Sequence, residues 1–253
     1  MTQPFRYLVT VFLMFLAPSL WAVQEAVEME GATPRKPAVF VVPEIAPWGY
    51  RSESGEPAGI VVALVDRMAE LADVPVRYQL RPHKRALTEL ESGSADFATL
   101  FRSPRSEAAG IAIAKLFDTR IVLTTLPDQS IMGLEDLAGK SVAYVEGTYY
   151  GEPFADKPEA EKVTVKGPKQ GLDLVDRGRV AALISFDAIL ERVIYASGHE
   201  ASDFRSHAIS EGMDGTLFIS RKSDLTDYIP LFQKAIEQMK ANGEIVDLIR
   251  SAP

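Results

Sequence analysis

The sequence predicts an α/β protein made of two lobes joined by extended strands. An apolar, β-branched run at residues 37–42 indicates a buried strand, and helix-spaced apolar residues at 59–73 complete a strand–helix unit. Strand and helix patterns continue to alternate after this unit. A long extended segment at 119–126 interrupts the alternation, and the αβ pattern restarts after it. Two half-size α/β lobes are the simplest arrangement that accounts for the interruption.

The first lobe is expected to begin with a β-α-β-α-β unit. After the first strand and helix, residues 76–80 alternate as a strand, and residues 84–91 have a helical pattern that stops at Ser92 and Gly93. Residues 95–101 then give a third apolar strand. Units of this kind form parallel sheets, and their ligand crevices lie beyond the carboxyl ends of the strands.

The second lobe is expected to repeat this alternation. Its predicted elements are a short helix at 133–137, a strand at 141–145, a helix at 169–177 and a strand at 180–185. The chain then returns through residues 213–220, and the stretch 228–239 is predicted to be a helix with one apolar face.

Residues 1–22 have the order of a secretory signal. A basic Arg6 precedes an apolar run at 7–16, and small residues then lead to an expected cleavage point after Ala22. A membrane anchor fits less well, because a spanning helix needs roughly 20 apolar residues. Residues 23–36 lack periodicity and are predicted to be a loose leader. We therefore expect export to the periplasm.

Composition excludes several kinds of site. The 253 residues contain no cysteine, which removes disulfides, thiolate metal ligands and the acceptor residue of a lipid anchor. The net charge of −8 makes nucleic acid an unfavourable partner, because phosphate binding needs clustered Lys and Arg. We expect a monomer that is not lipid-anchored, with no cofactor and no metal site.

Four stretches resemble a known family. They are residues 47–50 with 59–64, residues 86–96, residues 134–148 and residues 232–249. Their order and spacing resemble the polar amino-acid type (family 3) of the extracytoplasmic solute-binding proteins that serve ABC importers.

The resemblance implies a two-lobed periplasmic-binding-protein fold with two hinge strands, of the type II-like form. Residues 37–122 plus 212–253 would form lobe 1, and residues 123–211 would form lobe 2. Such lobes close around a ligand by hinge motion. The implied function is binding of a small polar solute, an amino acid or a related organic acid or amine. The implied partner is the membrane permease of an ABC importer.

Residues after two of the strands are candidate ligand contacts. Trp48 and Tyr50 lie where the family presents aromatic rings to its ligand, although core packing is an alternative. Thr148 and Tyr149 follow the strand at 141–145, and a helix beginning there would direct free N–H groups into the cleft. The resemblance implies that Thr148 holds an anionic group; a helix cap alone is the alternative.

The end of the third strand departs from the family pattern. Relatives usually have a Thr-Pro-Glu-Arg sequence here, whose Arg grips the ligand carboxylate. Aligning Ser103-Pro104 with Thr-Pro places Ser106 at the Arg position. Arg102 or Arg105 could substitute, because a guanidinium offers two parallel donors to a carboxylate. Phe101 precedes them as a further candidate contact, and solvated loop charges are the alternative for both arginines.

A second departure concerns the acidic residue that takes the ligand amino group. Phe186 falls at that position and Asp187 comes one residue later, which reverses its face on a regular strand. Curling of the chain at the strand end could restore the face, so Asp187 is a candidate contact for the ligand amino group. Arg85 is also a candidate contact by resemblance, whereas His83 is expected at the surface without metal partners. A buried zwitterion without its Arg and Asp would be costly, so an amino acid is only the default ligand.

Three functions remain open at this point. The first is a transport receptor, which has no catalytic residues. The second is a cleft enzyme of the dehydratase type, for which Glu146 or Glu152 could supply an acid or base. The third is a ligand-sensing partner of a membrane receptor. Hydrolysis by a nucleophile is disfavoured, since the sequence has no Gly-x-Ser-x-Gly motif and no phosphate-binding glycine loop.

Overall fold

The computed structural model describes residues 35–157, 159–210 and 212–251. The expected signal segment, residues 1–22, lies outside the described residues, and so does the expected leader up to residue 34. From Lys36 onward the chain is built on two five-stranded sheets, which are described in turn below.

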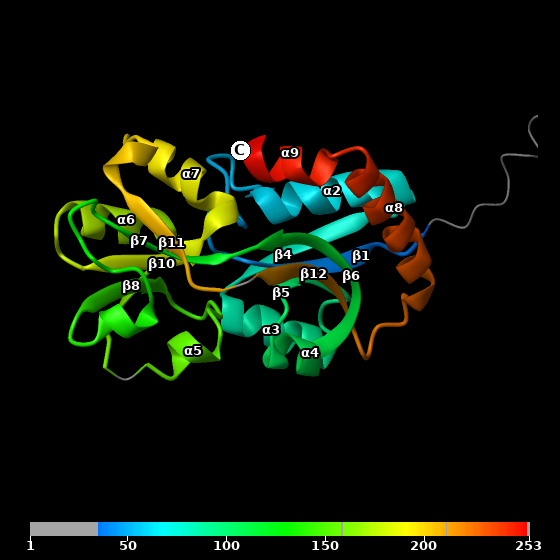
Figure 1. Cartoon of the computed structure of the whole chain (residues 1–253). Coiled ribbons are helices and arrows are strands. Elements are labelled where there is room, and N and C mark those ends of the chain that lie inside the picture. The colour runs from blue at the N-terminus through cyan, green and yellow to red at the C-terminus, as the bar shows by residue number, and fades with distance from the viewer. Residues whose placement is uncertain (1–34, 158, 211, 252–253) are drawn as a thin grey trace, which may run out of the picture. The chain divides into compact units, whose positions relative to one another are not determined.

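The first sheet has the strand order β4-β1-β5-β12-β6 (Figure 1). Its strands are β1 (Ala38–Pro43), β4 (Val76–Arg81), β5 (Phe97–Phe101), β6 (Gly110–Thr119) and β12 (Met213–Ser220). Strand β1 pairs in parallel with β4 and β5, whereas β12 runs antiparallel to β5 and β6. Because β1 lies inside the sheet under helices, its sequence is an almost continuous apolar run.

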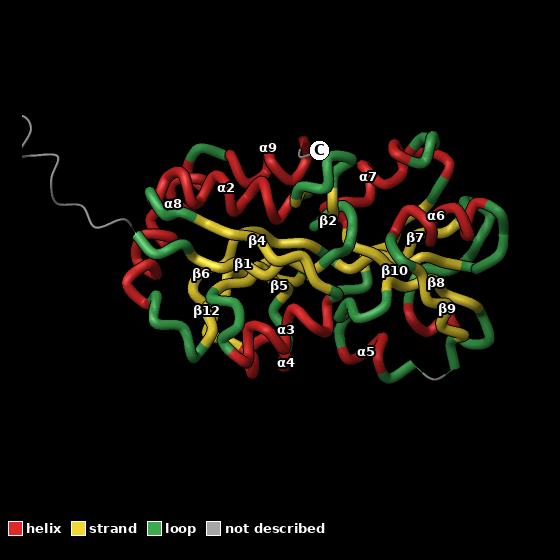
Figure 2. Tube along the Cα trace, turned by 180° about the vertical axis from the view of Figure 1, so that it is seen from behind, coloured by secondary structure: helices red, strands yellow, loops and turns green. Residues whose placement is uncertain are grey.

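Helices cover both faces of the first sheet. Figures 1 and 2 show α2, α8 and α9 on one side and α3 and α4 on the other. Their bounds are Ile60–Ala72 for α2, His83–Ser92 for α3, Pro104–Ala109 for α4, Ile229–Ala241 for α8 and Glu244–Ser251 for α9. Helix α3 ends where Gly93 adopts a φ of 80°, a left-handed conformation that favours glycine. The Ser92-Gly93 stop predicted from the sequence is confirmed.

The second sheet has the order β11-β7-β10-β8-β9. Its strands are β7 (Ile121–Thr125), β8 (Ser141–Val145), β9 (Glu161–Val165), β10 (Ala182–Phe186) and β11 (Arg205–Ala208). The three strands β10, β8 and β9 are parallel, and β7 is antiparallel to β10 and β11. Its helices are α5 (Glu152–Ala155), α6 (Pro168–Asp176) and α7 (Asp187–Ala196). Helix α7 follows β10 without a loop, and it also contacts α9 of the first sheet.

Shorter elements complete the described chain. They are the strand pair β2 (Tyr50–Arg51) and β3 (Pro57–Ala58), and the single 3₁₀ turns η1 (Leu134–Leu137), η2 (Ala201–Asp203) and η3 (Thr226–Tyr228). Within the described residues, no helix combines the length and the apolar character that crossing a membrane requires.

The chain passes between the two sheets twice. It leaves the first sheet after β6 and enters the second with β7, so that Arg120 is the only residue between the two strands. It returns between β11 and β12. The expected lobe boundaries at 122 and 212 are close to these two crossings, and the division into lobes stays a prediction.

Elements with strong apolar patterns form where the sequence predicts them, within a few residues. One exception is the extended segment at 119–126, which is the junction of two strands, β6 and β7, rather than a single strand. Strand β6 begins at Gly110, and the sequence gives little sign of it because several of its residues are exposed at the sheet edge. Helix α7 was also not predicted, although Ile189, Leu190, Val193 and Ile194 form a buried helical face.

The core between the first sheet and α8 contains three mutually packed rings. Phe40 of β1 and Phe97 of β5 are stacked with ring centroids 5.1 Å apart. Phe232 of α8 meets both edge-on, at 5.7 Å and 5.1 Å. Edge-to-face and stacked pairs at these distances stabilise a fold beyond the apolar area that they bury.

We predict that Phe232→Ala destabilises the protein by about 3–5 kcal/mol, because it removes a fully buried ring and leaves a cavity. Urea unfolding followed by circular dichroism measures the change. Val246→Ala on α9 is the control, since Val246 is exposed and should change the midpoint little. An equal loss in both variants would contradict the assignment of Phe232 to the core.

Candidate functional site

A cavity of about 70 Å³ lies between the two sheets, beyond the carboxyl ends of β1, β5, β8 and β10. Residues from both sheets line it. They are Pro43, Ile45, Trp48, Val61, His83, Leu87, Thr99, Leu100, Phe101, Ser103, Ser106, Phe117, Val145, Thr148, Tyr149, Tyr150, Pro168, Ser185, Phe186, Ile189 and Gly215. This is the position at which parallel α/β sheets hold ligands.

Aromatic rings form much of the wall. On the first-sheet side, Trp48 stacks on Phe117 at 5.5 Å and meets Phe101 edge-on at 5.3 Å. Gly215 of β12 permits this packing, because a Cβ atom there would lie 2.4 Å from the ring of Phe117. The cavity is therefore bounded by flat, rigid surfaces.

Phe186 joins the rings of the two sheets. It ends β10, stacks on Phe101 with centroids 4.2 Å apart, and meets Trp48 edge-on at 6.3 Å. On its own side it stacks on Tyr150 at 5.3 Å. We call these five rings, Trp48, Phe101, Phe117, Tyr150 and Phe186, the aromatic cluster. Through it the two sheets contact each other at the position where the family resemblance implied an aspartate.

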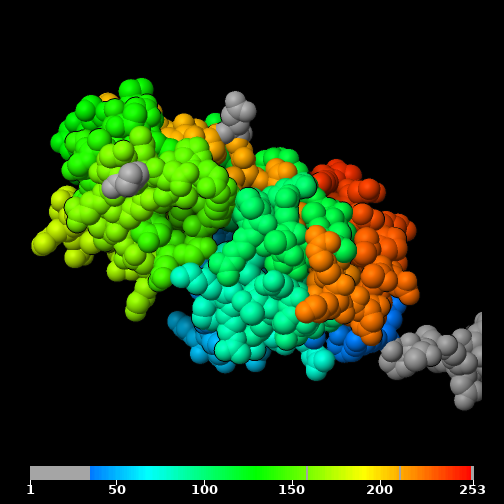
Figure 3. Space-filling view, turned by 90° about the horizontal axis from the view of Figure 1, so that it is seen from below, coloured from blue at the N-terminus to red at the C-terminus, as the bar shows by residue number. Residues whose placement is uncertain are grey.

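The two sides also meet beside helix α3. Seen from below, the residues of α3 lie against the residues that follow β8 (Figure 3). Lys84 Nζ of α3 is 3.6 Å from Glu146 Oε1 across this seam. A Cβ atom added to Gly147 would lie 3.5 Å from the Cβ of His83. On this side of the cavity, α3 of the first sheet therefore lies beside the turn that follows β8 of the second.

His83 is half-buried and lines the cavity, although the sequence suggested a surface position. Burial and, secondarily, the positive charge of Arg105 lower its pKa to about 4. The imidazole is therefore neutral at pH 7. A neutral imidazole offers one donor and one acceptor rather than a charge.

The two serines that begin α4 are already hydrogen-bonded. Ser103 caps the helix by accepting from the Ser106 backbone N–H at 3.1 Å, and Ser106 Oγ accepts from the Ser103 N–H at 2.9 Å. Ser106 Oγ also lies 3.0 Å from the carbonyl oxygen of Phe101, to which it can donate. Ser106, which stands at the family's arginine position, is thus part of a helix cap.

Two other residues of the lining carry hydroxyls that are themselves buried and have no hydrogen-bond partner among the described residues. They are Thr99 of β5, which is 5% exposed, and Ser185 of β10, which is 2% exposed. The two residues come from different sheets. Buried hydroxyls are normally paired, so these two are exceptions that need an explanation.

The sequence-predicted contacts divide into two groups. Trp48, Phe101, Thr148 and Tyr149 line the cavity. The residues outside the lining are Tyr50, Arg85, Arg102, Arg105 and Asp187. Contact with a ligand stays a prediction for every member of both groups.

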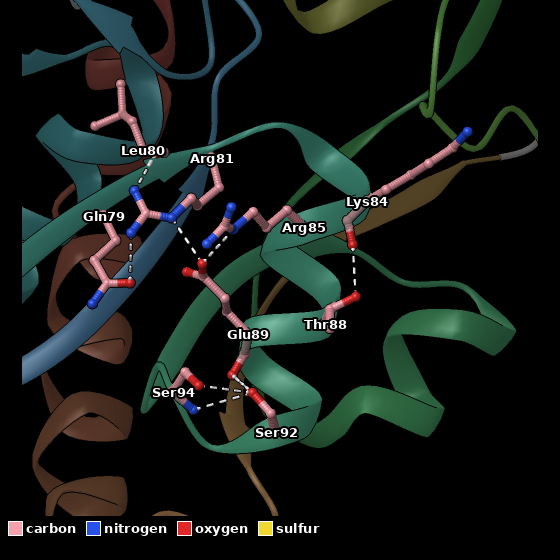
Figure 4. Close-up of polar contacts among 9 residues, drawn as sticks. All are labelled: Gln79, Leu80, Arg81, Lys84, Arg85, Thr88, Glu89, Ser92 and Ser94. Atoms are coloured by element: carbon pink, nitrogen blue, oxygen red, sulfur yellow. Dashed lines mark hydrogen bonds and ion pairs between the residues drawn. The ribbon is translucent and has the colours of Figure 1, made fainter.

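The arginines outside the lining mostly have carboxylate partners. Arg85 Nε donates to Glu89 Oε1 at 2.9 Å, which directs its side chain along α3 (Figure 4). The same oxygen accepts from Arg81 Nε at 2.8 Å. Arg102 Nε is 2.5 Å from Glu107 Oε1 at the surface. Arg105 is exposed, and its charge acts on His83.

Asp187 is the first residue of α7 and binds the crossing between β6 and β7. Its Oδ1 accepts from the Thr119 hydroxyl at 2.8 Å and from the Arg120 backbone N–H at 2.9 Å. Its Oδ2 accepts from Arg120 Nε at 2.7 Å. Burial alone would raise the pKa of Asp187, but the hydrogen bonds from Arg120 and Thr119 outweigh burial and lower it. This carboxylate stabilises the junction between the sheets.

The expectation that a helix begins at Thr148 is wrong. Gly147 adopts a φ of 80°, and the Thr148 N–H donates to the Val145 carbonyl at 3.2 Å, so the chain makes a turn here. Helix α5 begins only at Glu152 and has four residues. Thr148 therefore lines the cavity from a loop, without the N–H groups of a helix end behind it.

Several lining residues were missed because nothing local marks them. Thr99 and Ser185 are single polar residues within apolar strands, which is compatible with ordinary core packing. Phe117 belongs to the strand that the sequence did not reveal. Among the described residues, no three His, Asp or Glu side chains gather closely enough to suggest a metal site.

A family model described as bacterial extracellular solute-binding proteins, family 3, matches residues 38–251. The amino-acid-binding protein AabA of Dichelobacter nodosus is 29% identical over 117 residues, which are 45% of this chain and 46% of that protein. The chain thus matches about half the length of this relative.

Solved structures share the fold at low sequence identity. An ancestral arginine-binding protein bound to arginine has a TM-score of 0.68 and 18% identity, over 85% of this chain and 96% of that chain. A histidine kinase sensor domain with similarity to periplasmic binding proteins has a TM-score of 0.70 and 18% identity, over 86% and 95% of the two chains. The predicted two-lobed periplasmic-binding-protein fold is confirmed.

We predict that Phe186→Ala costs about 3–5 kcal/mol and loosens the contact between the sheets, because this ring joins both halves of the aromatic cluster. Small-angle scattering should show a larger radius of gyration. Phe154→Ala is the control, since Phe154 is buried and its ring contacts, Tyr144 and Tyr150, lie on the second-sheet side. It should lower stability without expansion. Equal radii for the two variants would contradict the bridging role.

We predict that Asp187→Asn lowers stability at pH 7 by about 1–3 kcal/mol, because an amide cannot accept all three hydrogen bonds. The pKa of Asp187 is lower in the folded chain, so its contribution is complete above the unfolded value of about 3.9 and is lost as the pH falls through the folded value. Urea midpoints of wild type and variant should therefore converge in acid. Asp224→Asn, at an exposed pair with Lys36, is the control and should change little at any pH.

Proposed function

Because this chain belongs to the bacterial extracellular solute-binding proteins, family 3, we propose that it binds a small polar solute between its two sheets and delivers it to an ABC importer. The partner in delivery is the membrane permease of that importer. Relatives are named for amino acids, which makes amino acids and related organic acids or amines the default solutes. We place the protein in the periplasm as a monomer that does not bind nucleic acid.

The observation that carries this proposal is a cavity walled by residues of two sheets that the chain links only by its crossings at β6–β7 and β11–β12. A wall shared in this way is complete only when the sheets are together. Opening at the crossings would admit a solute, and closure would enclose it. We propose that residues 37–122 plus 212–253 and residues 123–211 are the two lobes that move.

Trp48, Phe101, Thr148 and Tyr149 are the proposed contacts that already line the cavity. Tyr50, Arg85, Arg102, Arg105 and Asp187 would reach a solute only if the lobes or the loops rearranged. Asp187 is the least favourable of these, because its carboxylate is occupied by Thr119 and Arg120.

Binding is favoured over catalysis by the chemistry of the wall. Glu146, one proposed acid or base, lies outside the lining and faces Lys84. Glu152, the other, also lies outside it and accepts from the Tyr149 hydroxyl at 3.2 Å. Family relatives are binding proteins, and we propose that this chain is not an enzyme.

We predict that a thermal-shift screen of amino acids, organic acids, amines and neutral solutes identifies at least one class that raises the melting temperature. A solute at 100 times its dissociation constant adds about 2.7 kcal/mol of stability. The hit should bind with one-to-one stoichiometry in calorimetry and remain chemically unchanged. Small-angle scattering should show compaction. Turnover of the hit would contradict a pure binding role, and no shift with any class would contradict the receptor proposal.

Sensing is the alternative to transport, because a histidine kinase sensor domain shares the fold. Fold alone does not separate the two roles. Reconstitution of the loaded protein with its permease distinguishes them. Stimulation of ATP hydrolysis by the complete importer, permease with its ATPase subunits, supports transport, and capture of a receptor kinase without stimulation contradicts it.

A further inference from the structure

The cations around the cavity differ in how their charge is compensated. Lys84 Nζ of α3 lies 3.6 Å from Glu146 Oε1, and Arg85 and Arg102 have carboxylate partners at 2.9 Å and 2.5 Å. Arg105 of α4 makes no ion pair and no side-chain hydrogen bond with another described residue. Within the described part of the chain, the positive charge of Arg105 is therefore left without a carboxylate.

Arg105 stands at the edge of the cavity. Ser103 and Ser106, which flank the Pro104-Arg105 pair at the start of α4, both line the cavity. Burial, and after it the charge of Arg105, lowers the pKa of the lining residue His83, so this charge is felt at the wall. The Arg105 side chain is exposed, and a local rearrangement at the start of α4 brings its end to the cavity edge.

No negative group is available for an ammonium. Among the residues that the structure describes, no Asp or Glu lines the cavity. Carboxylates outside the lining are engaged by other groups: Asp187 Oδ2 accepts from Arg120 Nε at 2.7 Å, and Glu107 pairs with Arg102. An ammonium enclosed here would have no opposite charge beside it, which is strongly unfavourable in a site shielded from water.

The aromatic rings offer little compensation for an ammonium. A cation is attracted by the face of an aromatic ring, not by its edge. In the aromatic cluster the faces are largely covered by other rings, since Trp48 stacks on Phe117 and Phe186 stacks on both Phe101 and Tyr150. The cluster is therefore suited to an apolar body rather than to a cationic group.

The cavity also limits the size of that body. Its volume is about 70 Å³. One water molecule needs roughly 10–15 Å³ by the same measure, so the space takes about five to seven groups of that size. The walls thus match a compact apolar body, and the uncompensated cation at the edge matches an anionic group attached to it.

We propose that the cavity takes a small organic acid that carries no ammonium group, with its apolar body between the aromatic walls and its carboxylate at the edge beside His83, where Arg105 binds it. The inference rests on the proposed receptor function and narrows its solutes from amino acids, organic acids and amines to monocarboxylates. A guanidinium donates two parallel hydrogen bonds to a carboxylate, so one unpaired arginine is sufficient. The neutral imidazole of His83 adds a donor.

The first test compares matched probes in calorimetry at pH 7. One set is leucine, isocaproate, isoamylamine and isocaproamide; the other is phenylalanine, hydrocinnamate, phenethylamine and hydrocinnamamide. The members of a set share one apolar body and differ in their charged groups. In each set that binds, the acid should bind at least about tenfold more tightly than the amino acid, the amine and the amide.

The second test assigns the carboxylate to Arg105. Arg105→Ala should weaken binding of the preferred acid by at least about tenfold and leave binding of its amide unchanged. Arg105→Lys keeps the charge without the two parallel donors, so its affinity for the acid should lie between those of Arg105→Ala and wild type. Because Arg105 is exposed, both variants should melt at the wild-type temperature without a ligand.

Arg221→Ala is the matched control for the loss of one positive charge. Arg221 is exposed and contacts the same helix, since its Nη2 donates to the Glu107 carbonyl oxygen at 3.0 Å. Neither Arg221 nor its neighbour Lys222 lines the cavity. Arg221→Ala should therefore bind the acid as tightly as the wild type does.

The outcomes separate this inference from the receptor proposal. If an amino acid, amine or amide binds as tightly as the acid of its set, the inference fails and the receptor function stands. Equal binding of the acid by wild type and Arg105→Ala also overturns it, because the carboxylate is then held elsewhere. If no probe binds but the broad solute screen identifies another class, only this inference fails. If that screen gives no shift either, both proposals fail together.

Discussion

The contact of Phe186 with the rings of the opposite sheet is the interaction on which the site depends. The chain links the sheets only through its crossings, so their faces are held together by side chains. Phe186 supplies this contact by stacking on Phe101 at 4.2 Å and on Tyr150 at 5.3 Å. Stacking is weakly directional and needs no solute, so it contributes to closure by itself. A solute shifts the protein further toward the closed form only by the amount by which it binds the closed form more tightly than the open form.

The crossing between β6 and β7 explains why Asp187 does not take the role of the family's aspartate, whose position is occupied by Phe186. Helix α7 starts directly at the end of β10, and its first residue turns toward Thr119 and Arg120. The one-residue displacement noticed in the sequence therefore moves the carboxylate from the cavity to the junction of the sheets. Ion pairing at a junction restrains its geometry, whereas an aromatic ring at the cavity sets what can be enclosed. Phe186 and Asp187 make different contacts because β10 ends at Phe186 and α7 begins at Asp187.

Local patterns predicted the strands and helices that have strong apolar periodicity, such as β1 and α2. The family resemblance, rather than any local pattern, located the two departures at Ser106 and Phe186. The position of His83 could not be predicted, because it lies beside Gly147, a residue of the other sheet's side that is distant in the sequence. The helix expected at Thr148 failed for a related reason: the positive φ of Gly147 makes a turn, and a resemblance to relatives does not specify that angle. Thr99 and Ser185 could be recognised only after both sheets were assembled around one cavity.

The departures from the family pattern are consistent with one another. If only the family's arginine were replaced, its aspartate would be left without an opposite charge. If only the aspartate were replaced, the arginine would be left without one. An unpaired charge is costly in an enclosed site. Here both positions are neutral, since Ser106 is part of a helix cap and Phe186 is part of the aromatic cluster. Of the cations near the cavity, Arg102, Lys84 and Arg85 are directed to carboxylates outside the lining, whereas the charge of the exposed Arg105 acts on His83. Because no Asp, Glu, Lys or Arg lines the cavity among the described residues, its walls discriminate mainly by shape and by neutral hydrogen bonds.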